Sequence, residues 1–165
     1  MPALELRDAT PEDVEEIASI YRHYVLTSAA TMELEPPDGI EMRRRLNDVH
    51  GRGLPFFIAE AEGKTVGYGY AAPFRPRPGY CYTVEDSIYV RAEEAGLGYG
   101  RQILAAVIDA CREYGARQMI AVIGGVNEPS MAMHRALGFV EAGVLRGAGW
   151  KFDQPQDITL MQLAL

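Results

Sequence analysis

A short glycine-rich segment, Gly96–Gly100 (Gly-Leu-Gly-Tyr-Gly), constrains this chain more than any other feature. The β-branched and aromatic run before it, Tyr80–Val90, predicts a long strand, and the periodicity after it predicts a helix over Tyr99–Tyr114. The first N–H groups of a helix lack intrahelical partners and lie at the positive end of its dipole. Glycine also lets a ligand approach the backbone closely. The segment therefore predicts a diphosphate-binding loop, the alternative being a glycine-rich turn that binds no ligand.

The spacing within this loop excludes two familiar phosphate sites. A P-loop ends in Gly-Lys-Ser/Thr, whereas Gly100 is followed by Arg101 and Gln102. A dinucleotide-binding fold requires G-x-G-x-x-G, and here the third glycine comes one residue too early. The net charge of −7 argues against a general nucleic-acid binder, which needs a basic face.

The rest of the chain predicts one domain over residues 1–165. Helices are expected to begin near Thr10, Asp38, Tyr99 and Asn127, and 73–79 is expected to be a proline-rich loop. Strands are expected at 4–7, 56–60, 65–71, 80–90, 118–123, 139–144 and 157–163. The apolar helix positions expected in the core are Val14, Ile17, Tyr21, Tyr24, Ile40, Met42, Leu46, Val49, Ile103, Leu104, Val107, Ile108 and Cys111. This order predicts an α/β (α+β) fold in which about four helices cover both faces of a mixed, mostly antiparallel sheet of six to seven strands.

Composition and the N-terminal sequence give an expected location. No stretch approaches the roughly 20 apolar residues of a membrane span, and residues 1–8 lack the regions of a secretory signal. The two cysteines, Cys81 and Cys111, suit a reducing compartment. We therefore expect a cytoplasmic protein without membrane or nucleic-acid partners and without a metal.

With the loop in place, the sequence resembles the GCN5-related N-acetyltransferase (GNAT) family. In that family a Gln/Arg-x-x-Gly-x-Gly/Ala turn binds the pyrophosphate of CoA through backbone N–H groups. Gly98 and Gly100 match this turn, but Ala95 stands where the family has Gln or Arg. The resemblance implies that backbone groups bind acetyl-CoA without help from that side chain.

A closer resemblance, over nearly the whole chain, is to the phosphinothricin (methionine sulfoximine) acetyltransferase branch. The matching stretches occur in the same order at 83–90, 120–124, 127–134, 137–139, 149–152 and 160–162. After Phe152 the branch usually has Gly-x-Trp-x-Asp, whereas this chain has Pro155 at the position of the aromatic. The resemblance implies that this aromatic forms one wall of the substrate pocket or a dimer contact, and its absence puts that wall or contact in doubt for this chain. The branch implies acetyl transfer from acetyl-CoA to the α-amine of a small amino-acid-like substrate, in a homodimer.

Direct acetyl transfer requires that the amine lose a proton and that the leaving thiolate be stabilised or protonated. Strand alternation places Glu85 on a polar row just before the glycine loop, where the branch has its base. His134 stands where the wider family usually has a tyrosine near the CoA sulfur, and its near-neutral pKa suits proton transfer to the thiolate or from the amine. A solvated glutamate and a packed histidine are the alternatives. Asp86 interrupts the apolar row, which predicts a mainly structural residue, either satisfied by nearby donors or displaced by a bulge.

The loop and the resemblance together assign the remaining site residues. Those predicted to contact acetyl-CoA are Ile88, Tyr89, Val90, Ala95, Gly96, Leu97, Gly98, Tyr99, Gly100, Arg101, Asn127 and Ser130. Those predicted to contact the amine substrate are Met32, Arg75, Arg77, Tyr80, Glu85 and Tyr89. The two arginines offer bidentate donors to an anionic group, and a solvated charged loop is the alternative. Two other functions stay open: acetylation of peptide N-termini or other amines, and a non-catalytic acyl-CoA-binding module.

Overall fold

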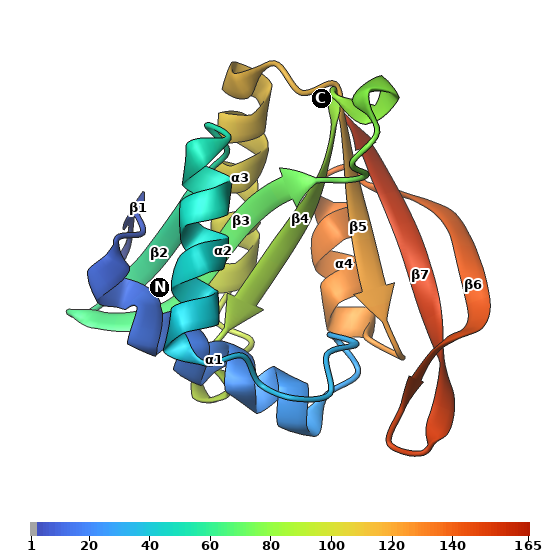
Figure 1. The fold of residues 1–165 in the computed structure, drawn as a ribbon, viewed down its shortest axis with the longest axis horizontal. Coiled ribbons are helices and arrows are strands. Elements are labelled where there is room, and N and C mark those ends of the chain that lie inside the picture. The colour runs from blue at the N-terminus through green and yellow to red at the C-terminus, as the bar shows by residue number, and fades with distance from the viewer. Residues whose placement is uncertain (1–2) are drawn as a thin grey trace.

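The computed structural model describes residues 3–165, and its element order agrees with the predicted order (Figure 1). The elements are β1 (Leu4–Asp8), α1 (Val14–Thr27), α2 (Gly39–Gly51), β2 (Phe56–Ala61), β3 (Lys64–Pro73), β4 (Thr83–Val90), α3 (Tyr99–Tyr114), β5 (Gln118–Gly124), α4 (Glu128–Ala136), β6 (Val140–Lys151) and β7 (Gln154–Ala164). Short 3-10 turns occupy Pro11–Asp13, Pro78–Tyr80 and Ala92–Glu94.

The strands of residues 3–165 form one seven-stranded sheet in the order β1-β2-β3-β4-β5-β7-β6. Every neighbouring pair is antiparallel except β4 and β5, which run parallel. Helices α1 and α2 cover one face of the sheet, and α3 and α4 cover the other (Figure 1). The predicted mixed, mostly antiparallel sheet with helices on both faces is confirmed.

A fork in the sheet follows from the short parallel pairing. β4 and β5 pair only at Thr83–Glu85 with Gln118–Ile120, and beyond these residues the two strands diverge (Figure 1). β3 meanwhile stays paired with β4 from Val84 to Val90 without a bulge. The second half of β4 therefore has one paired edge and one open edge, which faces the fork.

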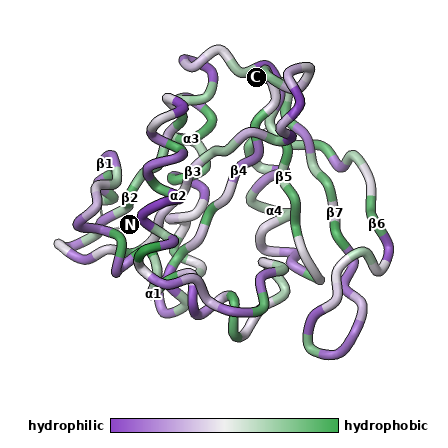
Figure 2. The backbone as a smooth tube through the Cα atoms, viewed as in Figure 1, coloured by the Kyte–Doolittle hydropathy of each residue, from purple (hydrophilic) through white to green (hydrophobic). Residues whose placement is uncertain are grey.

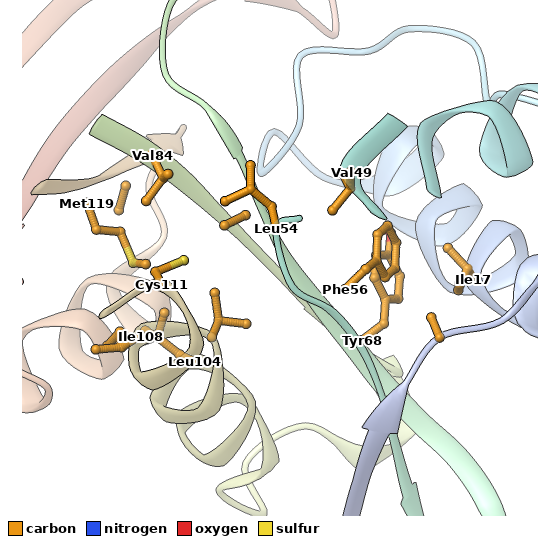
Figure 3. Packing of buried hydrophobic residues seen from close by; sticks show 14 of the residues in the cluster. Ile17, Val49, Leu54, Phe56, Tyr68, Val84, Leu104, Ile108, Cys111 and Met119 are labelled. Atoms are coloured by element: carbon orange, nitrogen blue, oxygen red, sulfur yellow. The ribbon is translucent and has the colours of Figure 1, made fainter. Parts of the chain in front are cut away.

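The core lies on both faces of the sheet. Hydrophobic residues run along the strands (Figure 2), and Figure 3 shows Phe56 and Tyr68 near Ile17 and Val49, the helix residues on one side. The predicted inward residues of α3, which are Ile103, Leu104, Val107, Ile108 and Cys111, are all buried on the other side.

Two glycines of β3 allow α3 to pack unusually close to the sheet. A Cβ atom at Gly69 would lie 2.5 Å from Ile103 Cγ2, and one at Gly67 would lie 3.1 Å from Ile103 Cδ1 and 2.8 Å from the carbonyl oxygen of Tyr89 in β4. The contacts of 2.5 and 2.8 Å are too short for a side chain, so only glycine fits at these two positions. This close packing fixes the start of α3, and with it the glycine loop, against β4.

Four details of the prediction were wrong. Ile40 is 82% exposed, because α2 buries Met42, Leu46 and Val49, and residue 40 points away from that face.

The other three errors concern strand boundaries. β4 begins at Thr83, because 78–80 forms a 3-10 turn that delays the strand. Pro73 ends β3, since a strand end tolerates a residue without an N–H. β6 and β7 are longer than expected: their pairing continues to Lys151–Gln154, past an irregularity near the glycines of β6.

Candidate active site

Two adjoining cavities occupy the fork between β4 and β5. One has a volume of about 300 Å³ and is lined by β4 from Glu85 to Tyr89 and by β5 from Ala121 to Gly124. The other, of about 340 Å³, is lined by the end of β4 and by the glycine loop. They share the residues Ala30, Ile88, Tyr89, Asn127, Ser130 and Met133. We call the first the amine cavity and the second the loop cavity.

The loop cavity contains nearly all of the residues predicted to contact acetyl-CoA. Its walls include Ile88, Tyr89, Val90, Ala95, Gly96, Gly98, Tyr99, Gly100, Arg101, Asn127 and Ser130. Leu97 is the exception, since it is 44% exposed and lies outside the cavity lining.

The glycine loop has the backbone geometry that an anion site requires. Gly98 is the N-cap of α3, with φ of +82°, and no side chain caps the helix there. A left-handed backbone of this kind favours glycine, and the uncapped N–H groups of the first turn keep their hydrogen-bonding capacity. Asn127, by contrast, caps α4 as predicted: its Oδ1 accepts a hydrogen bond from Ser130 N at 3.2 Å. The loop cavity thus combines free backbone donors with the positive end of a long helix.

Glu85 lies at the base of the fork, at the last position where β4 pairs with β5. It lines the amine cavity and is partly buried. Burial raises the pKa of its carboxyl above the usual range, and the charge of Asp86 adds to this effect, whereas Arg75 acts in the opposite direction. A carboxylate with a raised pKa in a cavity is a stronger base than a solvated glutamate.

Asp86 and His134 form a buried pair on the other face of β4. Asp86 Oδ2 lies 2.9 Å from His134 Nε2, and the two side chains are 3% and 4% exposed. His134 Nδ1 lies 2.7 Å from the carbonyl oxygen of Ser130. The carbonyl and the Asp86 carboxylate are both acceptors, so both ring nitrogens carry a hydrogen when the two bonds are made, and the ring is then an imidazolium. Burial acts to lower the pKa of the imidazole, but the hydrogen bond and charge of Asp86, with the Ser130 carbonyl, outweigh it and raise the pKa.

This geometry answers the question that the sequence left open about Asp86. The residue is not displaced by a bulge, because β4 keeps a continuous register with β3. A hydrogen bond from His134 satisfies one of its oxygens, and among residues 3–165 the other, Oδ1, has no partner. Both nitrogens of His134 are occupied, so a proton transfer from His134 to a thiolate requires that one of these bonds break.

Among the residues predicted to contact the amine, Met32, Glu85 and Tyr89 line the amine cavity. Arg75, Arg77 and Tyr80 do not line it. The Arg75 guanidinium stacks on the ring of Phe74, with Cζ 4.4 Å from the ring centroid, and Tyr80 is 44% exposed. Arg75 is near enough for its charge to act on Glu85, although it lies outside the cavity. Contact of these three residues with the substrate stays a prediction.

Sequence reasoning missed several residues of the amine cavity, and Arg45 is the most informative of them. Arg45 lines the cavity and forms ion pairs with Glu33 at 2.5 Å and with Glu41 at 2.9 Å. The signal was present in the helical periodicity, because residue 45 falls on the stripe formed by Met42, Leu46 and Val49. An arginine on an otherwise apolar stripe is a candidate site residue. Tyr21 and Tyr70 also line this cavity and come from α1 and β3.

The described residues offer neither a metal site nor a membrane-spanning helix. Within residues 3–165, no three His, Cys, Asp or Glu side chains gather in a way that would hold a metal ion. No helix in the same range combines the length and apolar content of a membrane span.

Comparison with known proteins identifies the family. The model of the acetyltransferase (GNAT) domain matches residues 6–160. A phosphinothricin N-acetyltransferase of Alcaligenes faecalis is 43% identical over 99% of this chain and 83% of its own. An L-methionine sulfoximine/L-methionine sulfone acetyltransferase of Pseudomonas aeruginosa is 37% identical over 97% of this chain and 94% of its own.

A solved structure extends the comparison to three dimensions. The phosphinothricin acetyltransferase of Sinorhizobium meliloti in complex with AcCoA superimposes with a TM-score of 0.96, at 43% identity, and the match covers 98% of this chain and 88% of that chain. The family model spans most of the sequence, and the relatives align over nearly its full length. The chain therefore belongs to the GNAT family and is an acetyl-CoA-dependent N-acetyltransferase.

Proposed function

We propose that this enzyme transfers the acetyl group of acetyl-CoA to the α-amine of a small amino acid of the phosphinothricin, methionine sulfoximine or methionine sulfone type. The relatives that carry these names support the substrate class. In the reaction, the amine nitrogen attacks the thioester carbonyl carbon, the C–S bond breaks, and CoA leaves as a thiolate. The proton of the amine passes to Glu85, directly or through a water.

The observation that carries this proposal is the position of Glu85 at the base of the fork. It stands in the amine cavity, beside the strand segment Ile88–Val90 that also lines the loop cavity. A base in this position reaches an amine held in one cavity while the acyl donor occupies the other. Because its pKa is raised, the Glu85 carboxylate binds a proton more strongly than a solvated glutamate does, which favours transfer of a proton from the amine.

The residues of the loop cavity fit acetyl-CoA as the acyl donor. A diphosphate requires converging backbone donors and little steric obstruction, and the loop supplies both through Gly98 and the first turn of α3. Ala95 offers no charged side chain at the first position of the turn, so binding there rests on the backbone. His134 as a proton donor to the thiolate stays a prediction, because both of its ring nitrogens are bonded to the protein.

A panel of amines tests the substrate class. We expect free-thiol release from acetyl-CoA with phosphinothricin, methionine sulfoximine or methionine sulfone, and acetylation at the α-amine when the product is analysed by mass spectrometry. Arg75→Ala and Arg77→Ala should raise KM for these substrates without changing the affinity for acetyl-CoA. If the enzyme ignores all three compounds and acetylates peptide N-termini or polyamines, the substrate assignment fails. Binding of acetyl-CoA without turnover on any amine would favour the non-catalytic alternative.

We also propose that the enzyme is a cytoplasmic homodimer. β6 is an edge strand of the sheet, and its region exposes apolar side chains at Val140, Leu145, Trp150 and Phe152. Exposed apolar side chains gathered on one edge are typical of protein interfaces. Light scattering should give about twice the chain mass of 18.2 kDa, and a monomer at all concentrations contradicts this assembly. Cell fractionation tests the location.

A further inference from the structure

The acidic residue next to the proposed base lies on the opposite side of the same strand. Glu85 pairs with Ala72, on the face that carries Tyr68, Tyr70 and Tyr89. Asp86 points the other way and contacts His134 of α4. Both carboxyl groups nevertheless line the amine cavity, because the fork opens through the sheet between its two faces.

The charge of Asp86 is compensated on one side only. His134 Nε2 is bonded to Oδ2, while among the residues described Oδ1 has no hydrogen-bond partner. The pair is almost fully buried, so little water screens it. A buried carboxylate with one free oxygen therefore stands beside Glu85, and His134 is the group that balances its charge.

The other charged or titratable groups near these two carboxyls are few. Arg75, from the loop before β4, acts on Glu85. Tyr70 of β3 and Tyr89 of β4 lie near Glu85, and Cys111 of α3 lies near Asp86. The amine cavity also carries Glu33 from the loop before α2, Arg45 from α2 and Tyr21 from α1. Among these groups Asp86 is the direct chain neighbour of Glu85, and its carboxyl group has one hydrogen-bond partner, the imidazole of His134.

We propose that the Asp86–His134 pair sets the basicity of Glu85, with Asp86 as a positioning residue that acts through its charge and His134 as the counter-charge that moderates it. The inference rests on the proposed role of Glu85 as the base. It also gives His134 a function that needs neither of its two hydrogen bonds to break. The pair touches neither substrate in this role.

The two partners predict opposite effects on the pH profile, which a purely structural pair does not. Asp86→Asn removes the negative charge beside Glu85, so the Glu85 carboxylate persists to lower pH. The acid limb of kcat, measured with both substrates saturating, should move down by about half a pH unit or more. His134→Gln keeps a hydrogen-bond donor to Asp86 but removes the positive charge, so the acid limb should move to higher pH.

The controls separate this role from folding and from direct catalysis. Asp109→Asn makes the same charge change on an exposed residue of α3 and should leave the limb in place. Should Asp86→Asn fail to fold, Asp86→Ser removes the same charge with a smaller side chain. The inference is overturned if the acid limb of kcat stays in place in Asp86→Asn and His134→Gln, or if it moves in the same direction in both variants. A His134→Gln enzyme that loses kcat by one factor at every pH also overturns it, because that result is expected of a direct proton donor.

The same series distinguishes failure of this inference from failure of the proposed function. If Glu85→Gln keeps wild-type turnover, Glu85 is not the base, and the proposed function fails together with this inference. If Glu85→Gln loses turnover while Asp86→Asn and His134→Gln leave the acid limb in place, Glu85 remains the base and only the proposed role of the Asp86–His134 pair is wrong.

Discussion

Replacing Glu85 with glutamine is expected to lower kcat by about 10²-fold or more, with the affinity for acetyl-CoA nearly unchanged. Glutamine keeps the size of the side chain and removes its basicity, so the variant tests proton transfer rather than packing. A 10²-fold loss corresponds to about 2.7 kcal/mol of transition-state stabilisation. The deficit should shrink as pH rises, because free amine then becomes plentiful and less of the rate depends on a base.

Steady-state kinetics across pH, with acetyl-CoA binding measured by calorimetry, check this result. Glu141→Gln provides a matched control, since Glu141 is an exposed residue of β6 outside both cavities. It should keep wild-type kinetics. A folded Glu85→Gln enzyme with wild-type kcat at neutral pH would rule out Glu85 as the base.

The second large effect concerns the glycine loop. Gly98→Val should weaken acetyl-CoA binding at least about tenfold, since a left-handed backbone costs an L-residue about 1–2 kcal/mol and the branched side chain projects near the anion site. The backbone at Gly98 has φ of +82°, which valine adopts only with strain. The expected loss appears in the Kd for acetyl-CoA, and the KM for the amine changes less.

Gly115→Val is the matched control for strain alone. Gly115 ends the same helix with φ of +96°, and a Cβ atom there meets nothing within 4 Å. It should lower the melting temperature as Gly98→Val does and leave the Kd for acetyl-CoA unchanged. Unchanged acetyl-CoA affinity in folded Gly98→Val protein, or equal losses in the two variants, would remove the loop from the binding site.

Much of the fold could be predicted from the sequence because the relevant signals are local. The apolar stripe of α3 has helical periodicity, and Gly115 ends that helix where expected. The errors come from effects that a local pattern does not contain. Residues 80–82 have high strand propensity, yet the 3-10 turn at 78–80 delays the strand. The irregular pairing of β6 near Gly147 and Gly149 likewise depends on the partner strand β7.

In the candidate site too, the parts built from local sequence could be predicted and the parts built by tertiary packing could not. Much of the loop cavity comes from the end of β4 and the glycine loop that follows it, so all of the residues predicted to contact acetyl-CoA except Leu97 line it. Its remaining lining residues, which the sequence did not predict, are Tyr24, Ala30, Glu94, Pro129 and Met133. The amine cavity draws Tyr21 from α1, Arg45 from α2 and Tyr70 from β3. Only tertiary packing brings these together, and of the three only Arg45 leaves a signal in the sequence, as a charged residue on the apolar stripe of α2. The resemblance favoured Arg75 and Arg77, but the arginine that lines the cavity is Arg45.

The fork in the sheet has a consequence for how such an enzyme can change over evolution. Along the open edge of β4, and at the start of α3, the groups available to the acyl donor are peptide groups, which every residue carries. Where the backbone does not require glycine, as it does at Gly98, substitutions there alter side chains without removing those donors and acceptors, and Ala95 is therefore compatible with the family turn. The amine cavity is instead built from side chains. Drift can therefore give this scaffold new acceptor amines while its acyl donor stays the same.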